Sequence, residues 1–188
     1  MRDPSRKRAT YADLLALPEH MVGQIIDGDL IALPRPANPH AYSTSNLGSD
    51  FNQRFGRSGP PGGWWIVDEP ELHFGEDVLV PDIAGWRRER MPEIPRAAFF
   101  TMAPDWVLEA LSPSTASIDR VRKARVYARE GVRWLWFLDP EARTIETNRL
   151  HEGNWLRTGA WTAGEKIRAE PFDVVELDST DWFLPPAT

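Results

Sequence analysis

The sequence predicts a mixed α/β fold in which a mixed β-sheet is flanked by helices. Three observations lead to this prediction. Helical and strand-like apolar periodicities both occur along the chain, and their order is helix, hairpin, helix, strand meander, helix and further strands. That order is not a regular βαβ series, and no glycine-rich phosphate loop accompanies it. The 188 residues suffice for a single domain. We expect its core over about residues 11–158 and a C-terminal docking tail over about residues 170–188.

Helices are expected where apolar residues recur every three or four positions. The three predicted helices cover residues 11–17, 40–55 and 118–130. Thr10 is placed to cap the first helix, and Leu47, Phe51 and Phe55 give the second an apolar face. Gly131 is placed to end the third helix as a C-terminal cap.

Strands are expected where short apolar or alternating runs lie between turn residues. The predicted strands cover residues 23–33 (a hairpin), 64–67, 71–74, 79–84, 106–111, 133–138, 144–149 and 154–158. Asp27-Gly28 is a strong signal for a tight hairpin turn. Residues 35–39 and 56–63 are proline- and glycine-rich connections. The charged, proline-containing segment 87–103 is expected to leave the sheet.

Composition excludes several classes of protein. The chain has no cysteine, which excludes disulfides, thiolate nucleophiles and cysteine-ligated metals. Its N-terminus is charged and lacks an apolar signal segment, and no apolar run approaches the roughly 20 residues that cross a bilayer. We therefore expect a soluble, cytoplasmic protein with no membrane partner.

The net charge of −6 gives no overall attraction to DNA, so nucleic-acid contacts would need a local basic patch. Two stretches are candidates for such a patch: Arg87, Arg88 and Arg90, and Arg120, Arg122, Lys123, Arg125, Arg129 and Arg133. The alternative is that both stretches are ordinary solvated faces.

Two carboxylates stand among apolar strand residues. In the strand predicted over residues 79–84, Asp82 shares a face with Val80 and Ala84, and Glu109 stands in a strand that is apolar on both sides. A buried ionised carboxylate costs several kcal/mol unless it meets a cation or strong donors. Hard oxygen ligands without cysteine favour Mg²⁺ or Mn²⁺. The alternative is that each acid pairs with an arginine or caps a loop.

The helix after Glu109 offers a cation. Asp119, Lys123 and Tyr127 follow one another at intervals of four, so they share one helix face. The residues expected to face the core are Val121, Ala124 and Ala128. On spacing alone, Lys123 could equally form a surface pair with Asp119.

Together these residues resemble the Uma-two family of restriction-endonuclease-like domains, which belongs to the PD-(D/E)XK nuclease-like superfamily. The resemblance runs from about Tyr11 to Trp155. The matching motifs are Ile25-Ile26-Asp27-Gly28-Asp29-Leu30, Pro39-His40, Pro81-Asp82, Val107-Leu108-Glu109-Ala110-Leu111-Ser112-Pro113-Ser114-Thr115, and Asp119…Lys123…Tyr127…Gly131-Val132.

The resemblance implies a restriction-endonuclease-like core with a metal-dependent nuclease site. Asp82 and Glu109 would bind Mg²⁺ (or Mn²⁺), and Lys123 would be the catalytic lysine, moved from the strand to the helix. Gln24 occupies the position at which family members commonly carry a glutamate, so this chain has one negative charge fewer there. His40 stands where the family often has a histidine, either near phosphate or as a helix cap. The expected supporting residues are Gln24, His40, Asp119 and Tyr127.

Three functions remain open at this point. The first is a DNA endonuclease, with a homodimer expected by analogy because two strands must be cut. The second is a non-catalytic descendant that binds nucleic acid or protein with a relic site, which the acidic charge and Gln24 favour. The third, a structural protein, leaves the buried acids unexplained. A serine hydrolase is set aside because the chain has no Gly-x-Ser-x-Gly motif.

Overall fold

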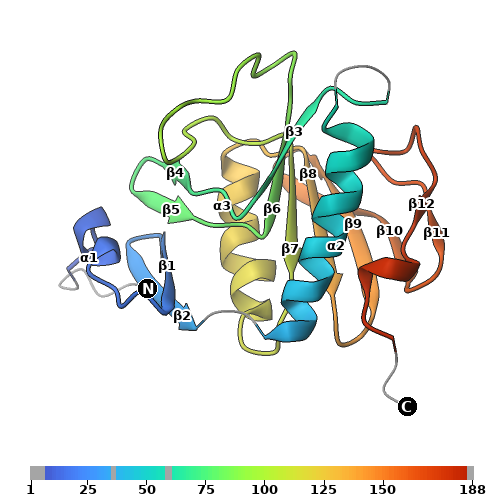
Figure 1. Cartoon of the computed structure of the whole chain (residues 1–188). Helices are drawn as coiled ribbons and strands as arrows, with labels where there is room; N and C mark the ends of the chain where they lie inside the picture. The colour runs from blue at the N-terminus through green and yellow to red at the C-terminus, as the bar shows by residue number, and fades with distance from the viewer. Residues whose placement is uncertain (1–6, 35–36, 58–60, 186–188) are drawn as a thin grey trace.

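A six-stranded mixed sheet forms the centre of the molecule (Figure 1). The computed structural model describes residues 7–34, 37–57 and 61–185. Its strand order is β10-β9-β8-β7-β6-β3, in which β7 and β8 are parallel and the other neighbours antiparallel. The strands are β3 (Trp64–Asp68), β6 (Ile83–Arg87), β7 (Trp106–Ala110), β8 (Trp134–Asp139), β9 (Thr144–His151) and β10 (Asn154–Thr162). This mixed α/β architecture confirms the predicted fold class.

A second, four-stranded sheet lies beside the first and has the order β2-β1-β5-β4. Its strands are β1 (Met21–Ile26), β2 (Asp29–Pro34), β4 (Leu72–Phe74) and β5 (Asp77–Leu79). The turn between β1 and β2 is Asp27-Gly28, with φ values of 56° and 84°. Two successive positive φ angles suit the right-handed twist of a two-residue hairpin, so the predicted hairpin is confirmed.

Helices cover both faces of the central sheet, while the short α1 (Tyr11–Leu15) lies beside β1 of the second sheet (Figure 1). Those that cover the central sheet are α2 (Asn38–Phe55), the π-helical turn η1 (Ile118–Lys123) and α3 (Ala124–Arg129), which continues η1. Thr10 caps α1 through a reciprocal pair of bonds with Asp13. Gly131 follows α3 with a φ of 77°, as expected of a C-terminal cap. The predicted helix over residues 118–130 is therefore present, but its first part is wound as a π-helix.

Apolar packing fixes which helix covers which face. Leu47, Phe51 and Phe55 of α2 are fully buried and pack in one cluster with Trp106 and Trp136 of the sheet. A second cluster on the opposite face joins α3 to the alternate residues of the same strands: Val126 and Tyr127 with Val107, Leu135 and Phe137. Figure 1 shows α2 in front of the sheet. Residues on β7 thus point alternately toward α2 and toward α3.

The predicted strand over residues 79–84 is wrong. β5 ends at Leu79 and β6 begins at Ile83, so Val80, Pro81 and Asp82 cross from the small sheet to the large one. Pro81 has no N–H to donate to a strand ladder, which explains the break. Asp82 consequently lies at the end of the central sheet rather than within a strand.

The predicted orientation of Val121 is also wrong. Its side chain is 45% exposed, whereas Val126 is buried in the core and Ala124 faces the core as expected. The helix turns the face of Lys123 and Tyr127 toward the sheet, and Val121 lies on the opposite side of the turn.

The connections behave largely as predicted. Residues 88–105 leave the sheet between β6 and β7, and the indole of Trp86 donates to the carbonyl of Met102 within that excursion. The predicted connections at residues 35–39 and 56–63 fall partly outside the described residues, as does the charged N-terminal stretch. None of the helices described is long and apolar enough to span a membrane.

The C-terminal segment folds back over α2. It forms β11 (Lys166–Ile167), β12 (Leu177–Asp178) and the short helix η2 (Thr180–Trp182). Trp182 and Phe183 are buried, with exposures of 1% and 2%. The Trp182 ring lies 5.6 Å from that of Phe51, and its indole donates to Asp50.

Candidate functional site

Asp82 lies where β6, β7 and the beginning of α2 meet. Its Oδ2 atom accepts a hydrogen bond of 2.7 Å from the backbone N–H of Ala110, and its Oδ1 atom lies 3.1 Å from Nε2 of His40. Burial acts to lower the pKa of His40, but the hydrogen bond and charge of Asp82 outweigh it, so that pKa is raised. The Ala110 N–H and the His40 ring therefore hold Asp82 from two sides.

Glu109 lies at the centre of the site. Its alternation on β7 turns it toward α3, and its side chain is 1% exposed. Its Oε2 atom accepts a 2.6 Å bond from Lys123 Nζ, and its Oε1 atom accepts one from the Tyr127 hydroxyl. Burial raises the pKa of Glu109 to about 8, against the opposing effect of Lys123 and with a further rise from Asp119 and Asp82.

Lys123 is a buried cation with three acceptors. Its ammonium donates to Glu109 at 2.6 Å and to the carbonyl of Val80 at 3.2 Å, and lies 3.3 Å from Asp119 Oδ1. Burial acts to lower the pKa of Lys123, but Glu109, Asp119 and Asp82 outweigh it and raise that pKa. The side chain is 3% exposed, so the surface-pair interpretation is wrong. The predicted shared face of Asp119, Lys123 and Tyr127 is the face that meets Glu109.

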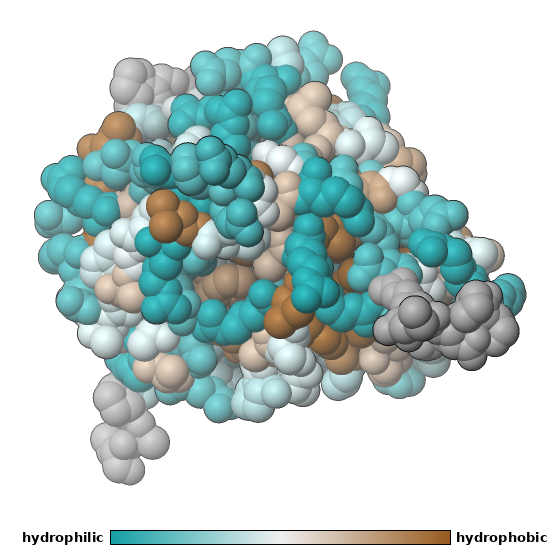
Figure 2. Space-filling view, turned by 180° about the vertical axis from the view of Figure 1, so that it is seen from behind, coloured by the Kyte–Doolittle hydropathy of each residue, from teal (hydrophilic) through white to brown (hydrophobic). Residues whose placement is uncertain are grey.

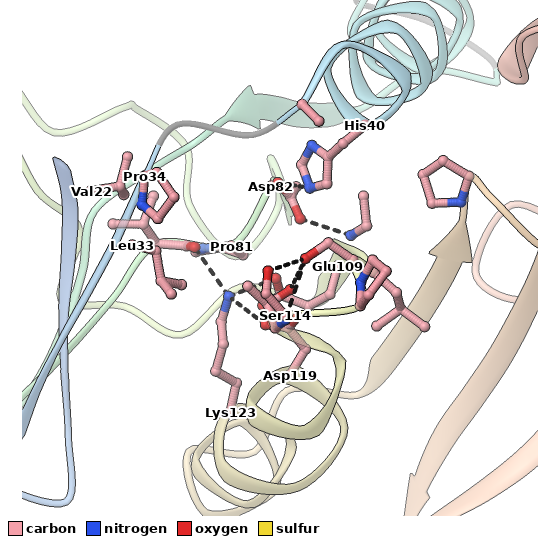
Figure 3. Close-up of a pocket in the computed structure, with 18 of the residues that line it drawn as sticks. Val22, Leu33, Pro34, His40, Pro81, Asp82, Glu109, Ser114, Asp119 and Lys123 are labelled. Atoms are coloured by element: carbon pink, nitrogen blue, oxygen red, sulfur yellow. Dashed lines mark hydrogen bonds and ion pairs between the residues drawn. The ribbon is translucent and has the colours of Figure 1, made fainter. Parts of the chain in front are cut away.

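These side chains open onto a cavity of about 380 Å³. We call Asp82, Glu109, Asp119 and Lys123 the charged centre, and Val22, Leu33, Pro34 and Pro81 the apolar wall. Figure 3 shows the apolar wall on one side of the charged centre, with His40 beside Asp82. The remaining lining comes from the start of α2, the loop Leu111–Thr115, Glu69, Val80, Pro140 and Glu141, together with Gln24.

Gln24 has a structural partner at this cavity. Its Oε1 atom accepts a 3.0 Å bond from the backbone N–H of Val80, and the residue is buried. Val80 therefore has its N–H bound by Gln24 and its carbonyl bound by Lys123. Both polar groups of the crossing residue are satisfied by side chains of the site.

Sequence reasoning located the acids but not the apolar wall. Val22 and Leu33 are direct partners in the β1–β2 register, so they point to the same side of the hairpin. Their pairing could have been read from the Asp27-Gly28 turn, because a two-residue turn fixes the register. Nothing in the sequence indicated that the hairpin lies against the end of the central sheet.

The donor chemistry of the cavity fits a divalent metal ion. Within the described ranges, no three acidic or histidine side chains converge on one point. Mg²⁺ needs only one or two carboxylates, because it keeps several of its waters. Asp82 and Glu109 supply two such groups, and the charge of Asp82 raises the pKa of Glu109. A cation between them would relieve this repulsion. Neither acid contacts an arginine in the part of the chain that the structure describes.

A family model matches most of this chain. The matching family model is Uma2, described as "Putative restriction endonuclease", and it covers residues 10–181. The chain belongs to the Uma2 family. This confirms the resemblance found in the sequence motifs.

A solved structure shares the fold of this Uma2 chain. It is the crystal structure of "a putative nuclease belonging to DUF820" from Anabaena variabilis ATCC 29413. The two chains are 24% identical, with a TM-score of 0.73, and the match covers 93% of this chain and 97% of the other. A comparison with curated proteins found no similar one.

The basic stretches of this Uma2 chain are largely engaged within the protein. Ion pairs from η1 and α3 include Arg120 with Glu146, Arg122 with Asp29, and Arg129 with Asp77. In the second stretch, the guanidinium groups of Arg87 and Arg88 stack on the rings of Trp64 and Trp65. Arg90 forms an ion pair with Asp105. Figure 2 shows the far side of the molecule, where hydrophilic residues cover most of the surface and hydrophobic patches are small. These contacts favour the alternative that both stretches are ordinary solvated faces rather than a basic patch for nucleic acid.

Proposed function

We propose that this Uma2 protein is an Mg²⁺- or Mn²⁺-dependent nuclease that hydrolyses phosphodiester bonds in DNA. One observation carries the proposal. A buried lysine, Lys123, bonds to Glu109 within a cavity that Asp82 also lines, and both acids are held in place by neighbouring groups. A structural ion pair would need neither the cavity nor the second acid.

Asp82 and Glu109 are the residues that would hold the metal. When bound, the ion supplies a water of lowered pKa and offsets negative charge on the phosphate. The backbone N–H of Ala110 and His40 fix the orientation of Asp82, and Tyr127 fixes one oxygen of Glu109.

Lys123 supplies a fixed positive charge. Its raised pKa keeps it protonated at neutral pH, so it stabilises negative charge on a phosphate entering the cavity and does not act as a base. Because three acceptors hold its ammonium, the charge needs no reorganisation when a substrate binds.

A second function is favoured by a different observation. Both oxygens of Glu109 are already engaged, by Lys123 and Tyr127, and the oxygen of Gln24 is engaged by Val80. A site satisfied in this way suits a non-catalytic module that binds nucleic acid or protein with a relic centre. Metal binding distinguishes the two functions.

Calorimetric titration with Mn²⁺ is the first test. We expect the wild-type protein to bind the ion and Asp82→Ala to lose most of this affinity. The exposed Asp173 lies outside the cavity, so Asp173→Ala serves as the control and should bind like wild type. Wild-type protein that takes up no ion would support the relic module.

Cleavage is the second test, with plasmid, single-stranded DNA and RNA incubated in Mn²⁺. Glu109→Gln should abolish cleavage; because the amide keeps the shape but leaves the buried Lys123 without its charged partner at 2.6 Å, some loss of stability is expected, and circular dichroism checks that the variant is folded. Lys123→Ala should lower turnover far more than Mn²⁺ affinity. Unchanged turnover in Lys123→Ala would remove the lysine from the mechanism, and sedimentation in the same buffer tests the proposed homodimer.

A further inference from the structure

The charged centre lies below the surface of the protein. Glu109 and Lys123 have side chains that are 1% and 3% exposed, and Asp82 reaches only 16%. A scissile phosphate must come close to these groups to react. The backbone of an intact duplex carries its paired bases with it and would have to enter the cavity together with them. A strand without a partner meets no such obstacle.

The cavity holds about one nucleotide. Its volume of about 380 Å³ is at the small end of the roughly 300–1,000 Å³ typical of sites for small ligands. The loop Leu111–Thr115 and the start of α2 bound it on the sides away from the hairpin. A cavity of this volume accommodates a single base with its sugar, whereas a base pair would bring two backbones with it.

The apolar wall offers a surface for the flat face of a base. Val22 and Leu33 are paired across the hairpin and are only partly buried, although both are apolar. Pro34 and Pro81 continue the same surface, and Figure 3 shows it next to Lys123. A phosphodiester hydrolase that bound only the backbone would have no use for an apolar surface at this place.

The charge around the cavity also favours an unpaired strand over a duplex. The acidic lining residues are Glu69, Asp82, Glu109, Asp119 and Glu141, against Lys123 and His40. Binding duplex DNA through its backbone requires many contacts between phosphates and basic residues. Four of the eight arginines in the two basic stretches form ion pairs within the protein and two more stack on tryptophan rings, so we expect affinity to come largely from the base.

We propose that the substrate of this site is unpaired DNA, one base of which enters the cavity and packs against the apolar wall. This rests on the proposed nuclease function and specifies its substrate. Drawing a base out of a duplex costs unstacking and unpairing energy that an already single-stranded segment does not require. Single strands, overhangs and gaps are therefore preferred to intact duplex.

The test uses the full-length protein in Mn²⁺ with three end-labelled substrates: a single strand, the blunt duplex of the same sequence, and that duplex with a central unpaired gap. We expect the single strand to be cut roughly tenfold faster than the duplex or more. In the gapped substrate, cuts should map to the unpaired segment. Equal or faster cleavage of the blunt duplex overturns the proposal.

A wall variant tests the role of the apolar wall. Leu33→Asp should raise KM for the single strand severalfold, because a charge replaces the surface on which the base packs. Leu15→Asp is the matched control, since Leu15 is 67% exposed on α1 and outside the cavity. If Leu33→Asp fails to fold by circular dichroism, Leu33→Ala replaces it. An unchanged KM in the folded wall variant overturns the role of the wall.

A binding measurement distinguishes failure of the proposed nuclease function from failure of the proposed substrate class. If no nucleic acid is cut, fluorescence anisotropy of the same labelled strands still measures binding. Tighter binding of the single strand than of the duplex, weakened by the wall variant and not by Leu15→Asp, supports the substrate class without catalysis. Equal binding of both, or binding that the wall variant leaves unchanged, overturns it.

Discussion

Tyr127 shows how much of this site depends on groups that would not touch substrate. The residue is fully buried under the sheet, and its hydroxyl donates to the oxygen of Glu109 that Lys123 does not reach. The two donors together leave the carboxylate a single orientation. Burial and the adjacent charge of Glu109 raise the pKa of Tyr127 well above its usual value, so the hydroxyl stays a donor.

Tyr127→Phe should therefore weaken both the fold and the site. It leaves one buried carboxylate oxygen without its donor, which costs about 1–3 kcal/mol of unfolding free energy. We expect urea unfolding to show this loss, and Mn²⁺ titration of the folded variant to show reduced affinity. Tyr42→Phe, on a ring that is 39% exposed, is the control and should change neither. Wild-type Mn²⁺ affinity in Tyr127→Phe would mean that the hydroxyl is not a positioning group.

Single residues of the charged centre were predictable from the sequence to an unusual degree. Glu109 stood out because its strand is apolar on both sides, and the fourfold spacing placed Asp119, Lys123 and Tyr127 on one face. Spacing alone could not tell a buried face from an exposed one. Which side of the helix meets the sheet is decided by tertiary packing, and for that reason Val121 was misplaced.

At the scale of elements, β6 is packed closely at Gly85. A Cβ atom at Gly85 would lie 3.1 Å from the Trp106 ring, 3.2 Å from Ile66 and 3.3 Å from the Trp64 ring. The absence of a side chain lets these three residues pack over the middle of the strand. Asp82 immediately precedes β6, so the position of its carboxylate depends on how β6 packs against these residues.

Gly85→Val should accordingly destabilise the protein. Added methyl groups in a packed core typically cost about 1–3 kcal/mol, and here aromatic rings on two strands would have to move. Ala160→Val on the exposed side of β10 adds similar bulk and should stay within roughly 0.5 kcal/mol of wild type. Chemical denaturation of both variants checks this, and a Gly85→Val protein as stable as wild type would show that the rings have room to shift.

The break at Val80, Pro81 and Asp82 was the largest error in the predicted elements. The apolar run from Val78 to Ala84 has strand-like periodicity, and that periodicity continues across the change of sheet. Pro81 was the available signal, since proline is confined to edges and interruptions of strands. The residues before and after Pro81 join different sheets because of long-range strand pairing. The apolar periodicity of the sequence carries no information about that pairing.

For the whole molecule, the C-terminal segment completes the packing on the α2 side of the sheet. Trp182, Phe172 and Phe51 meet there, far apart in sequence and in ring contact. The sequence predicted a docking tail over about residues 170–188, and the helix against which it packs could not be read from the sequence.

Trp182→Ala should be among the most destabilising single changes in the chain. Removing a buried tryptophan side chain costs roughly 3–5 kcal/mol, and the indole bond to Asp50 is lost as well. Thermal unfolding should show a large drop in Tm, while Val174→Ala, at a residue that is 69% exposed, leaves Tm unchanged. A small drop in Trp182→Ala would mean that α2 holds its place without the C-terminal segment.

The bond from Lys123 to the carbonyl of Val80 has a mechanical consequence. Val80 directly follows β5 of the four-stranded sheet and Glu109 lies on β7 of the central sheet, so the Lys123 ammonium makes one of the bonds that join the two sheets. A non-catalytic descendant would still use this bond to stabilise its fold. Selection can therefore preserve this lysine for its structural contacts alone, and Asp82, which binds the Ala110 N–H and contacts His40, has structural contacts of the same kind.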